Sequence, residues 1–336
     1  MKCLITGICG QDGAYLAKLL EHRGFDIIGI DRPRSSLDAF ARLQAVGCGD
    51  IKILNGDISD KSFLSRVCKN VRPDAIFNLA AESFVGSSWN APTRVLRVNA
   101  DAVLHLCELV RSDFPDTKLY QASTSEMFGG REAEPLNELS RMEPNSPYAI
   151  AKLAAHGFVR NYRESFNLFM VAGILFNHES PLRGDQFVTQ KIIKHCKKIG
   201  CLEGPTRPIL KLGNLNAIRD WGYAAEYMQA ACQMMFDVEK PDDFVIGTGK
   251  GLSVRDFASI AFELVGRPVI WVGSGLSERA VFEDESGVAI EVTEEYYRPA
   301  EVNHLIADSS KAKEQLDWAP KTFGRALVAK MINDEF

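Results

Sequence analysis

The sequence predicts an α/β fold, in which a doubly wound parallel sheet is joined to a smaller C-terminal α/β lobe. Three observations predict it. In the first half, short apolar runs alternate with amphipathic segments, which is typical of strand–helix–strand units. A glycine-rich turn separates the first apolar run from the first helical segment. After about residue 180 the alternation weakens, and proline and glycine divide the chain into shorter pieces.

The apolar runs give the expected strands in chain order, with helical segments such as Ala14–His22 and Ala102–Arg111 between them. Right-handed crossovers between such strands generate the doubly wound arrangement. The expected strands are Cys3–Thr6, Ile27–Ile30, Ile51–Leu54, Ala75–Leu79, Leu119–Ala122 and Leu168–Ile174.

The first turn carries a phosphate-binding pattern. Gly7, Gly10 and Gly13 have the spacing G-x-x-G-x-x-G between a strand and a helix, with Gln11 and Asp12 inside the motif. These glycines permit a tight turn, a close approach of backbone amides to a pyrophosphate, and close packing of helix on strand. The anion would then lie at the positive end of the helix. We therefore predict a dinucleotide site here.

Two later strand ends fit the same site. Asp57 and Ile58 follow the third strand, where a carboxylate can bond an adenine amino group or cap the next helix. The run Leu79, Ala80 and Ala81 ends the fourth strand, and its small side chains let the backbone pass under a cofactor.

The predicted domain division follows from these patterns. Residues 1–180 form a Rossmann dinucleotide-binding domain, with later returns near 210–260, and residues 181–336 mainly form the second lobe. The expected returns are a strand at Phe244–Ile246 and a helix at Val254–Leu264 that Ser253 caps. The acidic stretch Glu278–Glu295 is expected to be a solvated loop or an edge of the second lobe.

Tyr148 and Lys152 are four residues apart at the start of a predicted helix, so both point from one face. A nearby ammonium and a positive nicotinamide favour the phenolate, and we expect them to lower the tyrosine pKa. Thr124 follows the fifth strand and supplies a hydroxyl, which completes a set for carbonyl–alcohol redox chemistry. Glu126 adds a carboxylate that simple dehydrogenation does not need, which indicates a second proton transfer.

Composition excludes other classes. The net charge of -5 disfavours a general nucleic-acid surface, and no run approaches the roughly 20 apolar residues of a membrane span. The N-terminus lacks the pattern of a secretory signal. None of the eight cysteines forms a CxxC pair or a cluster with zinc spacing. We expect a cytoplasmic protein with reduced thiols, no metal, and no nucleic-acid or membrane partner.

Eight segments resemble GDP-mannose 4,6-dehydratases, which are extended short-chain dehydrogenases/reductases, in order and spacing over nearly the whole chain. GILFNHESPLRG and LGNLNAIRDWG are far more specific than generic dehydrogenase motifs. The segments are TGICGQDGAYLAKLL, NLAAESFVGSSWNAP, YQASTSEMFG, SPYAIAK, GILFNHESPLRG, FVTQKI, LGNLNAIRDWG and YYRPAEV.

The resemblance implies a role for each matching position. Thr124 would bond the sugar O-4, and Tyr148 would take its proton as hydride leaves C-4. Glu126 would act as base at C-5 and acid at C-6, and hydride return to C-6 would regenerate the cofactor. Lys152, Ser83, His178 and Arg183 match positions near the cofactor. The positions that match the nucleotide-sugar site are Ser83, Ser125, Asn177, Val188, Lys191, Gly213, Arg219, Arg298 and Glu301. A homodimer or homotetramer is also implied.

The chain departs from the family pattern at three places. Glu82 replaces the usual Gln, Phe84 stands where some members have His, and Asp31 ends the second strand where the family usually lacks an acid. Asp31 would favour the ribose hydroxyls of NAD. Arg32 and the run Arg34, Ser35 and Ser36 would favour the 2'-phosphate of NADP. Two arginines outweigh one carboxylate, so we predict NADP, with NAD as the alternative.

Four functions remain open at this point. The first is a hydro-lyase that converts GDP-mannose to GDP-4-keto-6-deoxymannose, in deoxysugar biosynthesis. The second keeps this chemistry on another nucleotide sugar, such as a GDP-heptose or a GDP-N-acetylhexosamine. The third is a 4-keto reductase or 4-epimerase, for which Glu126 would be idle. The fourth is a redox-sensing binding protein, which the intact Thr124, Tyr148 and Lys152 disfavour.

Overall fold

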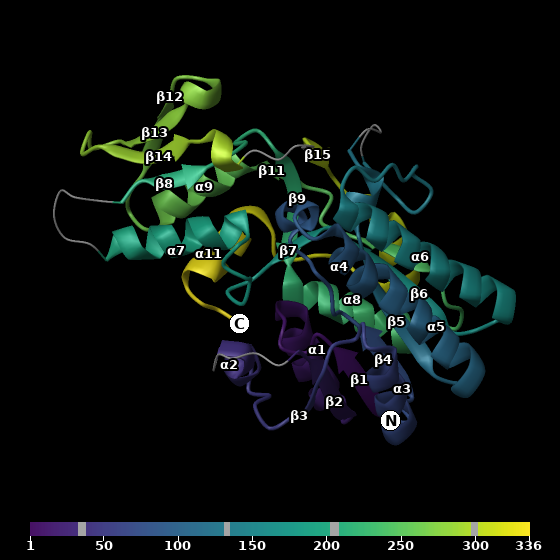
Figure 1. Ribbon diagram of the computed structural model, residues 1–336. Coiled ribbons are helices and arrows are strands. Elements are labelled where there is room, and N and C mark those ends of the chain that lie inside the picture. Colours follow the sequence, from purple (N-terminus) through teal and green to yellow (C-terminus); the bar gives the residue numbers. More distant parts are fainter. Residues whose placement is uncertain (33–37, 131–134, 202–207, 297–301) are drawn as a thin grey trace.

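The computed structural model describes residues 1–32, 38–130, 135–201, 208–296 and 302–336, and Figure 1 shows their arrangement. Its centre is a seven-stranded sheet made of β1 (Lys2–Thr6), β2 (Asp26–Asp31), β3 (Lys52–Asn55), β4 (Ala75–Asn78), β5 (Lys118–Thr124), β6 (Met170–Leu175) and β10 (Asp243–Ile246). The order is β10-β6-β5-β4-β1-β2-β3, and every pair is parallel. Chain order reverses between β1 and β4, which confirms the doubly wound fold. Ligands bind such sheets at the carboxyl ends of the strands beside this switch point.

Helices cover both faces of the sheet, because side chains alternate along each strand. On β1, Cys3 and Ile5 pack with α1 and α8, whereas Leu4 packs with α3, α5 and α6. The strands are therefore apolar over much of their length, which is why their apolar runs were visible in the sequence. Within the described ranges, no helix is both long and apolar enough to cross a bilayer. The helices of this lobe are α1 (Gln11–His22), α2 (Asp38–Ala45), α3 (Lys61–Val71), α4 (Pro92–Leu96), α5 (Ala102–Asp113), α6 (Pro147–Phe166), α8 (Ala224–Phe236) and α10 (Ser310–Leu316).

The second lobe contains two small sheets and three helices that pack on each other. One sheet has the order β11-β9-β15, with β7 also paired to β9, and the other has the order β12-β13-β14-β8. These strands are β7 (Asn177–Glu179), β8 (Leu210–Leu212), β9 (Ile218–Tyr223), β11 (Gly251–Ser253), β12 (Val269–Val272), β13 (Arg279–Phe282), β14 (Val288–Val292) and β15 (His304–Leu305). The helices are α7 (Val188–Gly200), α9 (Val254–Leu264) and α11 (Gly324–Ile332).

The chain returns to the first lobe in a way that the sequence predicted only in part. The expected strand at Phe244–Ile246 is β10, at the edge of the main sheet beside β6. The expected helix Val254–Leu264 is α9, and Ser253 caps it by accepting from the Asp256 amide. The prediction that this helix returns to the first lobe was wrong, because α9 packs against α7 and α11 of the second lobe. The helices that return are α8, which packs against α1, and α10, which packs against β10 and α8.

The acidic stretch Glu278–Glu295 is not a loop throughout. It contains β13 and β14, which are the two inner strands of their sheet. Ala280 and Ile290 are fully buried, and Glu278 is buried as the ion-pair partner of Arg255, with 2.7 Å between the nearest oxygen and nitrogen. The overall acidity of the segment concealed these buried alternate positions.

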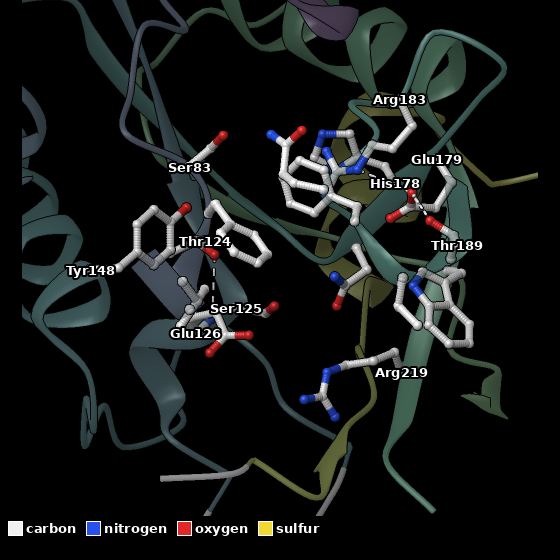
Figure 2. Close-up of a pocket in the computed structure, with 18 of the residues that line it drawn as sticks. Ser83, Thr124, Ser125, Glu126, Tyr148, His178, Glu179, Arg183, Thr189 and Arg219 are labelled. Carbon is white, nitrogen blue, oxygen red and sulfur yellow. Dashed lines mark hydrogen bonds and ion pairs between the residues drawn. The ribbon is translucent and has the colours of Figure 1, made fainter. Parts of the chain in front are cut away.

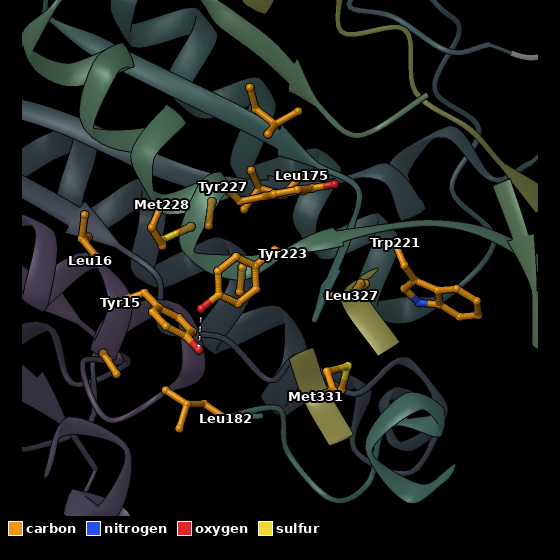
Figure 3. Packing of buried hydrophobic residues seen from close by; sticks show 14 of the residues in the cluster. Tyr15, Leu16, Leu175, Leu182, Trp221, Tyr223, Tyr227, Met228, Leu327 and Met331 are labelled. Carbon is orange, nitrogen blue, oxygen red and sulfur yellow. Dashed lines mark hydrogen bonds between the residues drawn. The ribbon is translucent and has the colours of Figure 1, made fainter. Parts of the chain in front are cut away.

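A shared core joins the two lobes, and Figure 3 shows it at close range. Tyr15 of α1 and Tyr223 of β9 lie edge to face, with ring centroids 5.6 Å apart. Met228 of α8 and Met331 of α11 belong to the same buried cluster. The lobes are therefore held together by continuous apolar packing, which fixes the walls of the crevice between them.

Candidate active site

A continuous groove follows the carboxyl ends of the strands at the switch point. It consists of two cavities of about 500 Å³ and about 310 Å³, which share Asp12, Ser83 and Arg183 among their lining residues. The smaller cavity lies against the glycine turn and the ends of β2 and β3. The larger lies between the end of β5, the start of α6 and the second lobe.

The glycine turn has the close contacts expected of a phosphate-binding loop. Gly7 has a φ of +71°, and a Cβ there would lie 2.9 Å from the Ala80 backbone. A Cβ at Gly13 would lie 2.4 Å from the carbonyl oxygen of Ile8. Gly10 precedes α1 and has no side chain to cap it, so backbone amides at the helix start face the groove. The predicted residues that line the smaller cavity are Gly7, Gly10, Gln11, Asp12, Gly13, Asp31, Arg32, Asp57, Ile58, Leu79, Ala80, Ala81, Ser83 and Arg183.

Asp31 is buried at the end of β2, and backbone amides hold its carboxylate. Cys9 N donates to Oδ2 at 2.9 Å, and Arg32 N donates to Oδ1 at 2.8 Å. The guanidinium of Arg32 instead donates to Glu82 Oε1 at 2.8 Å. Arg34, Ser35 and Ser36 lie outside the described residues.

Asp57 lines the cavity and does not cap the following helix, which resolves one alternative. It accepts from the amide and hydroxyl of Ser59 at 2.9 and 2.8 Å, whereas Asp60 caps α3. Burial raises the pKa of Asp57, but these hydrogen bonds and the nearby Arg94 lower it by more, so its pKa is below the ordinary value. The carboxylate is therefore ionised beside the groove.

The four predicted catalytic side chains meet in the larger cavity, as Figure 2 shows for three of them. Thr124 ends β5, and its hydroxyl accepts from the Glu126 amide at 3.3 Å, in the short helical turn Ser125–Phe128. Tyr148 and Lys152 occupy the first two turns of α6. This helix begins with Pro147, and Ser146 caps it by accepting from the Ala149 amide. The four side chains are buried, and Ser125 lines the same cavity.

Burial has the largest effect on the pKa values of Tyr148 and Lys152. It raises the pKa of Tyr148 to about 12, although a hydrogen bond with Thr124 lowers it in part. The sequence had suggested a lowered value. The ammonium of Lys152 donates to the Ala122 carbonyl at 2.8 Å and lies 6.0 Å from the centroid of the Tyr148 ring. Burial lowers the pKa of Lys152 to about 8. A phenolate here requires a further positive charge.

His178 of β7 closes the groove on the opposite side and bonds to the start of α1. Its Nε2 lies 3.0 Å from Asp12 Oδ2, and its Nδ1 lies 2.8 Å from the Phe176 carbonyl oxygen. Gln11 donates to the backbone oxygen of His178 at 3.1 Å. These contacts tie the glycine turn to the second lobe.

Glu179 and Arg183 form a buried pair that sequence reasoning recognised only through the arginine. Arg183 Nε lies 3.1 Å from Glu179 Oε2, and the Thr189 hydroxyl donates to the same oxygen at 2.5 Å. The guanidinium carbon of Arg183 also lies 3.5 Å from the centroid of the Phe187 ring. These neighbours fix the direction of the guanidinium, which lines both cavities. Figure 2 shows Arg183 close to Glu179 in one of them.

The second lobe supplies the remaining wall of the larger cavity. The ammonium of Lys191 lies 3.6 Å from the centroid of the Tyr296 ring, and a Cβ at Gly213 would lie 2.4 Å from the Tyr296 carbonyl oxygen. Arg219 is buried and donates to the Ile218 carbonyl at 3.0 Å. Arg298 and Glu301 lie outside the described residues. The predicted residues of this lobe that line the cavity are Asn177, Val188, Lys191, Gly213 and Arg219.

A family model described as GDP-mannose 4,6 dehydratase matches residues 4–331 of the chain. The chain belongs to this family. The "GDP-mannose 4,6 dehydratase 2" of Caenorhabditis elegans is 40% identical over 98% of this chain and 87% of the relative. The human "GDP-mannose 4,6 dehydratase" is 40% identical, with 98% and 90% covered, and the "GDP-mannose 4,6-dehydratase" of Vibrio cholerae is 38% identical, with 99% and 93% covered. The family predicted from the motifs is confirmed.

Solved structures of more distant enzymes share the fold of this GDP-mannose 4,6-dehydratase family member. A UDP-glucose 4-epimerase from Thermotoga maritima with UDP-glucose is 22% identical, with a TM-score of 0.81 over 99% of this chain and 98% of that one. A dTDP-glucose 4,6-dehydratase from Bacillus anthracis with NAD is 20% identical, with a TM-score of 0.80 over 99% and 96%.

The groove fits the nicotinamide cofactor that this family implies. The glycine turn leaves no room for side chains where a pyrophosphate would approach α1. Asp31 and Arg32 line the smaller cavity at the end of β2, where the adenosine end of a dinucleotide would lie. Tyr148 and Lys152 lie in the adjoining larger cavity. The cavity sizes are of the order expected for small-molecule sites.

Several lining residues of this family member were not singled out from the sequence. Phe187 and Trp221 lie within segments that resemble the family, so their motifs were a usable signal. Glu179 was adjacent to His178 in such a segment. No sequence pattern pointed to Arg42, because it reaches the groove only when α2 folds beside the glycine turn. It donates to the carbonyl oxygens of Leu182 and Cys9 at 2.8 and 3.3 Å.

Proposed function

We propose that this family member is a hydro-lyase that converts GDP-mannose to GDP-4-keto-6-deoxymannose. One observation carries the proposal. Glu126 lines the same cavity as Thr124 and Tyr148 and is only 8% exposed. A buried carboxylate beside a tyrosine–lysine pair supplies the second proton transfer that elimination needs and that dehydrogenation alone does not.

The side chains divide the reaction between them. Thr124 bonds the sugar O-4, and Tyr148 removes the O-4 proton when the carbon is oxidised. The resulting ketone acidifies the C-5 proton, which Glu126 removes and then transfers to the C-6 hydroxyl, so that one water leaves. A bound nicotinamide would supply the redox chemistry, as acceptor of the C-4 hydride and its donor to C-6, and the proton that Tyr148 removed from O-4 would return to C-5. The net change is the loss of one water.

Burial makes a charged partner decisive for Tyr148. Its raised pKa means that the phenol is protonated at neutral pH, and only a positive charge close to the oxygen makes proton removal favourable. An oxidised nicotinamide provides that charge. Lys152 positions the cofactor ribose through an ammonium that the Ala122 carbonyl orients. This coupling makes tyrosine activation depend on cofactor binding.

We further propose NADP as the cofactor. Arg32 and Arg42 line the adenosine end of the groove, and guanidinium groups are the usual donors to a 2'-phosphate. Arg34, Ser35 and Ser36 follow in the chain. Asp31, with its carboxylate at the end of β2, supports the alternative, NAD. His178 and Arg183 would contact the cofactor.

The nucleotide sugar would lie along the second lobe. Asn177, Val188, Lys191, Gly213 and Arg219 line that wall, and we propose that Arg298 and Glu301 join them from outside the described residues. Ser83 and Ser125 would face the sugar. A homodimer or homotetramer and a cytoplasmic location stay predictions from the family resemblance and the sequence.

One assay tests the activity. Purified protein is incubated with GDP-mannose without added reductant, and the products are analysed by mass spectrometry. A product lighter by one water that carries a 4-keto group is expected. A C-4 epimer without water loss would instead identify an epimerase. No change with GDP-mannose, but water loss from a GDP-heptose or a GDP-N-acetylhexosamine, would keep the chemistry and replace the sugar.

A further inference from the structure

Glu82 lies at the centre of an ion-pair network beside the adenosine end of the groove. Its Oε1 accepts from Arg32 Nη1 and from Arg94 Nε, both at 2.8 Å. Arg94 also reaches Asp57, with 3.5 Å between Nη2 and Oδ2. One carboxylate oxygen thus connects two arginines, Arg32 at the end of β2 and Arg94 in α4.

The backbone of Glu82 is fixed, so this carboxylate is not simply a mobile surface group. Asn99, which is buried, donates to the Glu82 carbonyl oxygen at 3.1 Å and accepts from the Glu82 amide at 2.9 Å. The side chain of Glu82 is 28% exposed, compared with 42% for Arg32. The arginine therefore has the greater freedom, and Glu82 is the fixed partner.

The ion pair with Glu82 matters because of where Arg32 lies. It lines the groove directly beside Asp31, whose position at the end of β2 is where a carboxylate meets the ribose hydroxyls of a dinucleotide. A 2'-phosphate on that ribose would therefore lie within reach of the Arg32 side chain. A phosphate monoester carries about -1.5 to -2 charges and gains most from bidentate guanidinium contacts. Glu82 competes for the same donors.

We propose that Glu82 is a positioning residue that holds Arg32 and thereby weakens the binding of NADP relative to NAD. The inference rests on the proposed function only in that the groove takes a nicotinamide dinucleotide. Charge at this end supports it. Asp31, Asp57 and Glu82 balance Arg32, Arg42 and Arg94 among the described side chains here, so loss of Glu82 leaves a net positive site. NAD has no 2'-phosphate, and its ribose contact with Asp31 would be unaffected.

The test is a competition for binding, without any sugar. Protein is equilibrated with equimolar NADP and NAD and desalted, and the bound nucleotides are released and quantified. Glu82→Gln should raise the bound NADP-to-NAD ratio about threefold to fivefold, as expected for release of one partly exposed ion pair. Glu164→Gln is the matched control. It removes the same charge from an exposed pair with Arg160 on α6 and should leave the ratio unchanged.

A second pair of variants tests whether the effect passes through Arg32. In an Arg32→Met background, Glu82→Gln should no longer change the ratio, because the two residues act as one unit. Glu82→Asp keeps the charge but withdraws it by one methylene, and it should raise the ratio by less. This variant carries the test if Glu82→Gln does not fold.

An unchanged or lowered ratio in Glu82→Gln would overturn the inference, as would a rise that persists without Arg32. Failure of the proposed function would be recognised separately. It would appear as a lack of water loss from the nucleotide sugar, while both cofactors still bind.

Discussion

His178 Nε2 lies 3.0 Å from Asp12 Oδ2, so an ion pair connects the second lobe to the first helix turn of the cofactor groove. Burial lowers the pKa of His178, but Asp12 raises it by more, and the net pKa is above its ordinary value. Burial raises the pKa of Asp12, but His178 reverses this and holds it at about 2. Both shifts describe the same interaction.

Asp12→Asn should lower the pKa of His178 below its ordinary value, because burial and Arg183 lower it and then outweigh the hydrogen bond to the Phe176 carbonyl, which raises it. A histidine with a raised folded-state pKa stabilises the fold below its unfolded pKa of about 6.5 and loses this as pH rises through the folded value. The aspartate contributes above about 3.9 and loses this as pH falls towards 2. The free energy of unfolding of the wild type should thus exceed that of Asp12→Asn by most between about pH 4 and 6.5. Histidine NMR titration and urea unfolding at acidic and alkaline pH measure both effects, and an advantage that does not vary with pH would contradict the assignment.

Glu126→Gln should slow the loss of water by about 10²- to 10⁴-fold while C-4 oxidation continues, because only elimination needs the carboxylate. Reduced cofactor should accumulate in a single-turnover absorbance experiment. Dehydration at the wild-type rate would exclude Glu126 as the base.

Tyr148→Phe should reduce turnover by about 10²- to 10⁴-fold, since the phenolic oxygen is the proposed base at O-4. GDP affinity, measured by isothermal titration, should stay at the wild-type value because the proposed GDP contacts lie on the second lobe. The tyrosine–lysine mechanism could not stand if the variant turned over normally.

Asp243→Asn should lower the free energy of unfolding by about 3–5 kcal/mol, because it leaves a buried guanidinium without its partner. Asp243 of β10 accepts from Arg163 of α6 at 2.7 and 2.9 Å, and both side chains are about one-tenth exposed. The denaturant midpoint should fall without a change in slope. Glu164→Gln on the exposed face of α6 should leave it nearly unchanged. Equal effects of the two substitutions would show that the Arg163–Asp243 pair adds nothing to stability.

The parallel strands could be predicted because strands buried on both faces contain nearly continuous apolar runs, as Cys3–Ile5 illustrates. The sequence could not show that α8, and not α9, returns to the first lobe. Both helices have apolar faces, and local periodicity does not say which partner covers such a face. The sequence AAEYMQAACQMMF of α8 is apolar on most sides, which fits its position between the main sheet and the second lobe.

The site likewise contains residues that the sequence could reveal and contacts that it could not. Thr124 and Tyr148 could be found because each lies at a strand end or a helix start with its own motif. The pairing of Glu82 with Arg32 joins positions 50 residues apart, and no local pattern encodes such a contact. The raised pKa of Tyr148 in the chain alone could not be predicted, because burial, which dominates it, is a property of the folded chain.

The return of the chain through α8 and β10 means that this protein has no interchangeable halves. A fragment that ended at residue 180 would lack the edge strand beside β6 and the helix that covers α1, and it would expose the apolar positions that they bury. A chimera that exchanges sugar-binding regions between relatives must therefore splice at several points along the chain. Transplanting one contiguous C-terminal block would replace part of the cofactor lobe with foreign packing.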